Sequence, residues 1–236
     1  MEVVKEFSKF ANEYEKHNII QTAVVKKLCE SLDKAFYENI LDVGAGTGGV
    51  YEELHQKNIK FSNFVALDFS QKMLDIHHTD CNIKKLCLDF NQKNFSSVFK
   101  VHEFDLLISS SALQWSHDLS QVLQELSLLS HNFVFSFFTA NTFKTLHQRA
   151  NIESPILSTE LIIEALNKFF IYDLELVEYQ LKFDSVREML HYIKKSGVSG
   201  GVKQLSYKQM KMLMMEYKLD YLEFEVLFVK VRSKKK

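Results

Sequence analysis

Apolar residues near the start of the chain recur at intervals of three and four positions, which is the period of one helix face. The pattern predicts an amphipathic helix over about residues 12 to 32. The residues that share its apolar face are Tyr14, Ile19 or Ile20, Val24, Leu28 and Leu32. We expect this helix to pack against the body of the fold or to form a lid over a site.

Short runs rich in β-branched and aromatic residues alternate with helical stretches between positions 39 and 138. The runs that predict strands are 39–43, 63–68, 84–89, 104–110 and 132–138. The stretches between them that predict helices are 51–57, 71–77 and 119–129. Such apolar runs are typical of parallel strands buried on both faces, and parallel neighbours require crossover helices. The alternation therefore predicts an α/β fold with a Rossmann-like, mostly parallel sheet.

The order of elements changes after Pro155, the only proline of the chain. The pattern there predicts, in order, a helix at 158–169, a strand at 171–183, helices at 185–195 and 206–217, and a strand at 221–231. Two strands with helices between them predict a carboxyl-terminal antiparallel hairpin, which completes a seven-stranded sheet. Since no repeat or Pro/Gly/Ser-rich linker interrupts the sequence, we expect residues 1–236 to form a single domain.

The composition limits the classes of partner and compartment. Hydrophobic residues make up 46% and charged residues 25% of the chain, which is typical of a globular protein. The formal net charge of -1 provides no overall field that gathers phosphates, so we expect no nucleic-acid partner. The cysteines (Cys29, Cys81 and Cys87) are odd in number and form no CxxC pair, which favours reduced thiols. The start of the chain lacks the pattern of a signal peptide, and no apolar run approaches membrane-spanning length, so we expect a cytoplasmic protein without a membrane partner.

A glycine-rich loop, GAGTGG at positions 44–49, follows the first predicted strand. The glycines of this loop satisfy the patterns GxGxxG and GxGxG equally. Glycines let the backbone turn sharply and approach a ligand closely, whether the ligand is a dinucleotide or another nucleoside. Asp42 distinguishes the two, since an acid at the strand end disfavours a pyrophosphate. S-adenosylmethionine (SAM) carries an ammonium and a sulfonium and no phosphate, so the sequence favours SAM over NAD.

Two further acids stand at the ends of the next two predicted strands. Asp68 lies about twenty residues beyond the glycines, where its oxygens can accept both ribose hydroxyls. Asp89 is followed by Phe90, and the pair suits an adenine amino group and ring. Each acid alone is better explained as a helix cap or a strand end. Their coincidence with the glycine loop at the carboxyl edge of one sheet favours a binding site.

Three motifs resemble the class I SAM-dependent methyltransferases: LDVGAGTG at 41–48, ALDFSQKMLD at 66–75 and FDLLISSSALQW at 104–115. Segments 7–21 and 183–201, with the SALQW sequence around the only tryptophan, are more similar to the BioC family, the malonyl-acyl carrier protein O-methyltransferases of biotin synthesis. Positions 146–148 and 225–232 add weaker agreement, so the resemblance covers nearly the whole chain. The chain departs from the family at Ser110, near His191 and in the short segment 127–133.

The resemblance implies SAM as the cofactor and a malonyl group on acyl carrier protein, or on coenzyme A, as the methyl acceptor. The residues that would hold SAM are Tyr14, Asp42, Gly44, Ala45, Gly46, Gly48, Asp68, Phe69, Met73, Asp89, Phe90, Ser109 and Ser110. A carboxylate is already anionic at neutral pH, so the reaction needs alignment and no catalytic base. The candidates for the substrate pocket are Tyr14, Gln114 and Trp115, with Arg149, His191 and Lys194 to hold the carboxylate.

Other functions fit parts of the same pattern. The fold hosts many methyl acceptors, so another small acid or a quinone is the nearest alternative substrate. A non-catalytic SAM-binding protein would share the cofactor motifs, and a dehydrogenase would share only the glycine loop.

Three remaining groups have plainer interpretations. His77, His78 and Cys81 suggest a solvated helix end more than a metal site, because adjacent histidines do not share a helix face. The methionines between 210 and 215 suggest a packing face, with a passage for an acyl arm as the alternative. The basic tail from position 230 is expected to be solvated, although it would suit an acidic carrier protein.

Overall fold

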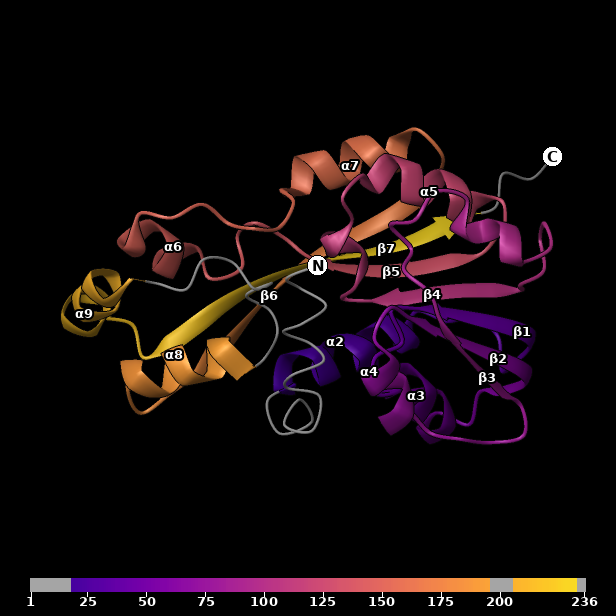
Figure 1. The fold of residues 1–236 in the computed structure, drawn as a ribbon, viewed down its shortest axis with the longest axis horizontal. Helices are drawn as coiled ribbons and strands as arrows, with labels where there is room; N and C mark the ends of the chain where they lie inside the picture. The colour runs from indigo at the N-terminus through magenta and orange to yellow at the C-terminus, as the bar shows by residue number, and fades with distance from the viewer. Residues whose placement is uncertain (1–17, 196–205, 233–236) are drawn as a thin grey trace.

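The computed structural model describes residues 18–195 and 206–232. The chain there alternates between strands and helices up to β5 and then continues with four helices and the two 12-residue strands β6 and β7 (Figure 1). In chain order the elements are α2 (Ile19–Glu30), β1 (Phe36–Val43), α3 (Gly49–Gln56), β2 (Lys60–Asp68), α4 (Gln71–Ile76), β3 (Ile83–Cys87), the 3-10 turn η1 (Phe95–Val98), β4 (Leu106–Ser110), the 3-10 turn η2 (Leu113–Trp115), α5 (Leu119–Ser127), β5 (Phe133–Phe138), α6 (Lys144–Ala150), α7 (Thr159–Asn167), β6 (Ile171–Lys182), α8 (Val186–Lys195), α9 (Tyr207–Glu216) and β7 (Tyr221–Arg232).

The strands form one seven-stranded sheet in the order β3-β2-β1-β4-β5-β7-β6. Strands β1 to β5 are parallel to one another. Strand β7 is antiparallel to both β5 and β6. This arrangement confirms the predicted α/β fold with its carboxyl-terminal hairpin. The strand order reverses between β1 and β4, and parallel α/β sheets bind ligands beside the carboxyl ends of the strands at such a point.

Helices cover both faces of the sheet, with α2 and α3 on one side and α5 and α7 on the other (Figure 1). In α5 the buried residues Leu119, Val122, Leu123 and Leu126 follow the spacing of one helix face. All six residues of β5 are buried, because the strand lies between two helical layers. The apolar runs in the sequence therefore mark the centre of the sheet.

The hairpin of β6 and β7 extends beyond the remainder of the sheet. β7 pairs with β6 along its whole length, from Tyr221 to Arg232, but with β5 only from Val226 onward. The extension supports α8 and α9, and α9 packs on α6 through a hydrogen bond from Gln209 Nε2 to Ala150 O at 3.0 Å (Figure 1). These three helices therefore form a group at the end of the hairpin where β7 begins.

The sequence predicted most of these elements and missed α6. That helix has seven residues, begins after Phe143 in a left-handed conformation, and has no side-chain cap at its amino end. Only Leu146 and Ala150 are buried in it, which is too few positions to establish a helical period. Among the helices in the described ranges, none combines the length and apolarity that a bilayer crossing requires.

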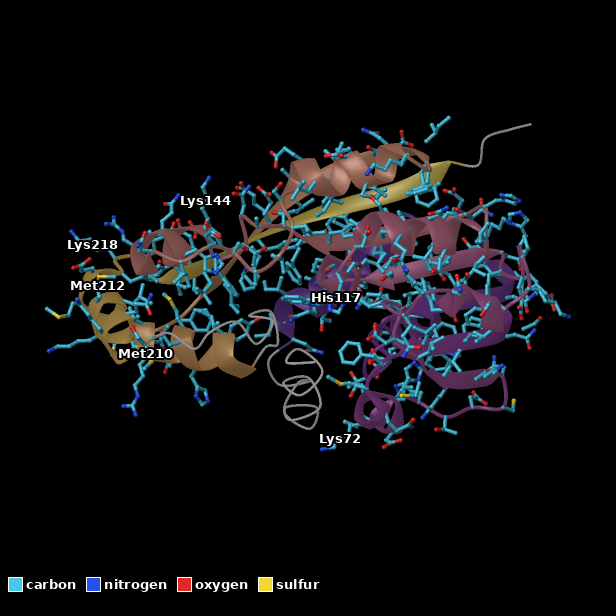
Figure 2. The ribbon with its side chains drawn as sticks, turned by 45° about the horizontal axis from the view of Figure 1, so that its top comes forward. Lys72, His117, Lys144, Met210, Met212 and Lys218 are labelled. Atoms are coloured by element: carbon cyan, nitrogen blue, oxygen red, sulfur yellow. The ribbon has the colours of Figure 1, made fainter. Side chains whose placement is uncertain are left out.

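The methionines of α9 do not form the packing face that the sequence suggested. Met210, Met214 and Met215 are 38%, 52% and 75% exposed, and the buried position of this segment is Leu213. Met210 is labelled in Figure 2. The prediction was wrong because α9 is attached to the fold along one narrow stripe only, so neighbouring positions lie in solvent.

Candidate functional site

The glycine loop connects β1 to α3 through three residues with positive φ. Gly44, Gly46 and Gly48 have φ of 79°, 55° and 102°. A Cβ on Gly44 would lie 2.2 Å from the Cβ of Ala112, whereas a Cβ on Gly46 would meet nothing within 4 Å. Gly44 is therefore required for close packing against the segment after β4, and Gly46 faces open space where a ligand can approach the backbone.

The three acids that the sequence singled out are staggered along the sheet edge. Asp42 is level with Ala66 of β2, and Asp68 is level with Cys87 of β3, so each acid lies two residues farther out than the one before. Their exposure follows this order, with Asp42 at 0%, Asp68 at 6% and Asp89 partly exposed. The innermost acid belongs to the central strand and the outermost to the edge of the sheet.

Asp68 is held in place by backbone N–H groups of the glycine loop and of α4. Gly46 N donates to its Oδ2 at 3.0 Å, and Ser70 N donates to its Oδ1 at 2.8 Å. Burial raises the pKa of the Asp68 carboxyl to about 6, and these two hydrogen bonds act in the opposite direction. A carboxylate offers about four acceptor positions. Each oxygen therefore retains capacity for a ligand hydroxyl, as the ribose assignment requires.

Asp42 is fully buried, and within the described part of the chain neither of its carboxylate oxygens has a hydrogen-bond partner. Burial raises its pKa well above the usual value, and the charge of Asp68 adds to the shift. An uncompensated buried carboxyl is costly, and a cation placed beside it would relieve that cost while a phosphate would increase it. The group thus suits the ammonium of SAM and is unsuited to a dinucleotide pyrophosphate.

A cavity of about 50 Å³ opens between the glycine loop, the start of α4 and η2. Its lining residues are Gly44, Gly46, Asp68, Phe69, Met73, Phe90, Ser110, Ser111, Ala112 and Trp115. Aromatic and apolar groups with a few polar atoms are typical of a nucleoside pocket. The space is smaller than SAM, and Asp42 does not line it.

The polar side chains at the end of β4 and in the segment after it differ in whether their polar atoms have hydrogen-bond partners. Ser109 Oγ donates to Val43 O at 2.7 Å and is completely buried, so its hydroxyl joins β4 to β1. Ser110 Oγ lies 3.2 Å from Ser136 Oγ and lines the cavity. Gln114 Nε2 donates to Ser111 O at 2.7 Å, while its buried Oε1 has no partner among the described residues.

Of the residues suggested for the substrate, only Trp115 is among the described residues that line this cavity. Arg149 on α6 and His191 on α8 are exposed, and neither lines the cavity. Tyr14 and the side chain of Lys194 lie outside the described residues. The roles assigned to these residues, and to those at the cofactor loop, remain predictions.

His77 is a neighbour of the glycine loop that the sequence did not identify. It is 2% exposed, and its ring lies 3.1 to 3.2 Å from the position of a Cβ on Gly48. Its Nδ1 is 3.0 Å from His78 O, and burial lowers its pKa. The expectation of a solvated helix end was wrong for His77, whereas Cys81 and His78 are exposed. The Nε2 atom of His78 contacts exposed Glu52 Oε1 at 2.6 Å.

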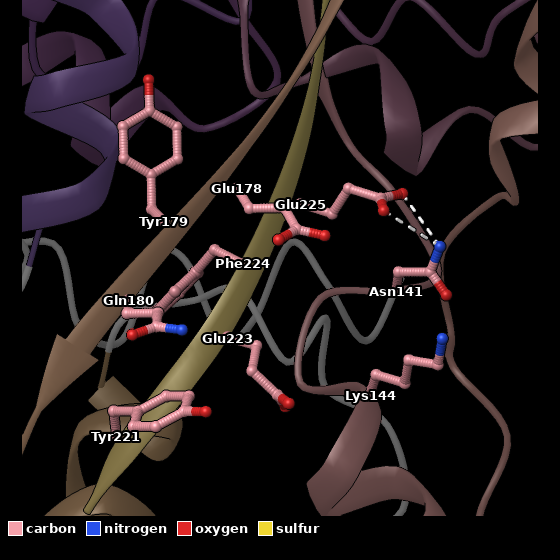
Figure 3. A pocket seen from close by; sticks show the side chains of 9 residues that line it. All are labelled: Asn141, Lys144, Glu178, Tyr179, Gln180, Tyr221, Glu223, Phe224 and Glu225. Carbon is pink, nitrogen blue, oxygen red and sulfur yellow. Dashed lines mark hydrogen bonds between the residues drawn. The ribbon is translucent and has the colours of Figure 1, made fainter.

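A second cavity, of about 260 Å³, lies beside the extended part of the hairpin (Figure 3). Its deepest acid is Glu225, which accepts hydrogen bonds from Thr139 Oγ1 at 2.5 Å and from Asn141 Nδ2 at 3.0 and 3.1 Å. These bonds fix the loop after β5 to β7 across more than eighty positions of sequence. The carboxylate therefore has a structural role, and the alternation of apolar residues in β7 gave no indication of it.

Comparison with known proteins agrees with this geometry. Residues 41–129 match the family model described as a methyltransferase domain. A SAM-dependent methyltransferase from Mesorhizobium loti superposes with a TM-score of 0.53 at 17% identity, covering 86% of this chain and 95% of that one. A Haemonchus contortus phosphoethanolamine N-methyltransferase, solved with S-adenosylhomocysteine, gives a TM-score of 0.55 at 17% identity, covering 91% of this chain and 52% of that one.

Residues 41–129, which include the glycine loop, thus match a methyltransferase domain, and the seven-stranded sheet has the fold of the SAM-dependent methyltransferases to which it is structurally similar. The chain is also similar to the malonyl-[acyl-carrier protein] O-methyltransferase of Bacillus anthracis. The two are 29% identical over 219 residues, which cover 83% of this chain and 79% of the relative.

Proposed function

We propose that this protein transfers the methyl group of SAM to the free carboxylate of a malonyl group carried as a thioester on acyl carrier protein. The observation that carries the proposal is the similarity to proteins of that activity over 83% of the chain. The product would be the methyl ester of the malonyl thioester.

Bound SAM would supply an electrophilic methyl group. The bond from this methyl group to sulfur would break as its bond to the acceptor oxygen forms, with release of S-adenosylhomocysteine. The residues of the chain position and enclose the reactants. Asp68 would accept the ribose hydroxyls, and Asp42 would balance the positive charge of the amino acid end. Phe69, Met73 and Phe90 would hold the adenine, and Trp115 would limit the access of water.

The chemistry of the cavity supports an acceptor that is already ionised. Among its lining residues in the described part of the chain, Asp68 is the only ionisable side chain, and its hydrogen bonds to Gly46 and Ser70 direct it to the cofactor. A hydroxyl acceptor would need a base to remove its proton, whereas a carboxylate has lost its proton well below neutral pH. Catalysis then depends on placing the oxygen in line with the methyl.

The proposal is tested with SAM labelled in its methyl group and a panel of acceptors: malonyl-carrier protein, acetyl-carrier protein, free malonate and a quinone. We expect label on the malonyl-carrier protein alone, and release of that label as methanol in mild alkali, as a methyl ester requires. Label on the quinone or free acid in preference would contradict the proposed acceptor. Binding of SAM with no transfer to any member of the panel would contradict an enzymatic role.

A further inference from the structure

The exposed side of α9 carries lysine and methionine side chains. Lys208, Lys211 and Met215 are spaced three and four residues apart, which places them on one face. All three are exposed, as are Met214 beside them and Lys218 just after the helix. We call these five residues the α9 surface. It combines positive charge with two methionines that are 52% and 75% exposed.

The opposite side of α9 attaches it firmly to the fold. Gln209, Leu213 and Tyr217 are four residues apart, so they share the buried side. Leu213 is 1% exposed and Tyr217 is 6% exposed. Ser206 and Gln209 form a capping box that fixes the amino end of the helix. The α9 surface is therefore presented by a well-anchored helix, and its exposed methionines have no packing role in the described part of the chain.

The position of α9 relates this surface to the reaction site. β7 is antiparallel to β5, so its beginning, next to α9, lies at the carboxyl end of β5, the sheet edge that also carries the glycine loop. Arg232 lies at the other end of β7, about 36 Å away at 3.3 Å per strand residue. Lys218, Met210 and Met212 are grouped at the end of the molecule formed by α6, α8 and α9 (Figure 2).

We propose that the α9 surface is the docking site for the acidic carrier protein that brings the malonyl group. This inference rests on the proposed function and names where that partner binds. Lysines complement an acidic partner and steer its approach, and methionine side chains adapt to an irregular apolar patch between the charges. Of the residues from α9 to Lys218, only Glu216 is acidic, so the surface has a clear positive bias.

The test compares two acceptors with one reacting group: malonyl-carrier protein and malonyl-pantetheine, which lacks the protein. The double variant Lys208→Glu/Lys211→Glu is expected to lose about tenfold or more in kcat/KM for the carrier protein at low salt, mainly through KM, and less as salt screens the charges. Its kcat/KM for malonyl-pantetheine should equal that of the unaltered protein. Met215→Ser should raise KM for the carrier protein without changing the salt dependence.

A matched control reverses two exposed lysines elsewhere, Lys60→Glu/Lys84→Glu, near the amino ends of β2 and β3. We expect this variant to behave as the unaltered protein with both acceptors. Equal losses with both acceptors, unchanged kinetics with the carrier protein, or a changed oligomeric state with unchanged kinetics would each overturn the docking site while leaving the proposed function intact. Failure of the unaltered protein to methylate either acceptor would overturn the proposed function as well.

Discussion

The substitution Asp42→Asn separates the stability of this protein from its function. Asparagine retains the shape of the side chain and removes a carboxyl group that is fully buried and has no hydrogen-bond partner among the described residues. We expect the variant to be more stable than the unaltered protein at neutral pH, and to bind SAM more weakly because the ammonium loses its counter-charge.

The size of the stability change follows from proton linkage. The folded-state pKa of Asp42 is raised well above the usual 3.8. Its contribution to stability is therefore complete below pH 3.8 and is lost as the pH rises from there toward the folded-state pKa. Each pH unit in this window costs about 1.4 kcal/mol. At pH 7, about three units above the usual pKa of 3.8, proton linkage therefore limits the gain from Asp42→Asn to about 4 kcal/mol, wherever the folded-state pKa lies above that usual value.

The assay is urea unfolding of both proteins, without SAM, from pH 3.5 to pH 8. We expect equal unfolding free energies at the acid end, and a difference in favour of Asp42→Asn that grows with pH and exceeds about 1 kcal/mol at pH 8. Calorimetry should show that Asp42→Asn binds SAM more weakly than the unaltered protein. A variant that is less stable at pH 8, or stabilised equally at every pH, would refute the assignment of a strained buried carboxyl.

Three further substitutions test other contacts. Asp68→Ala should weaken SAM binding by about 2 kcal/mol, because two charge-assisted hydrogen bonds to ribose are lost, and unchanged affinity by calorimetry would place the ribose elsewhere. Gly44→Ala should lower both the melting temperature and SAM affinity, since its Cβ would lie 2.2 Å from that of Ala112, and a normal melting temperature would contradict this packing. Glu225→Ala should reduce the free energy of unfolding in urea by about 2 kcal/mol or more by leaving buried donors unpaired, and a loss below 0.5 kcal/mol would contradict its structural role.

The sequence determined the order of strands and helices because each central element carries its own periodic signature. The run at 133–138 is apolar except for Ser136 and is buried on both faces of the sheet. The positions of the glycine loop and of the three acids followed from the strand ends. The sequence did not indicate how deeply each acid is buried. That depends on the stagger of neighbouring strands, which buries Asp42 completely and leaves Asp89 partly exposed.

The remaining differences arise from contacts between distant segments. His77 and His78 are equivalent in the sequence, and only the path of the chain after α4 directs the first beneath Gly48 and the second to solvent. Glu225 appears in an alternating strand, and its burial depends on donors from the loop after β5. Periodicity reports which side of an element is apolar, and it does not report which partner covers that side.

The most direct test of the proposed reaction is the intact mass of malonyl-carrier protein after incubation with SAM and this protein. A gain equal to one methylene on the malonyl form, with no change in the acetyl form, is the predicted result. An unchanged malonyl form, together with methylation of a quinone or another small acid under the same conditions, would contradict it.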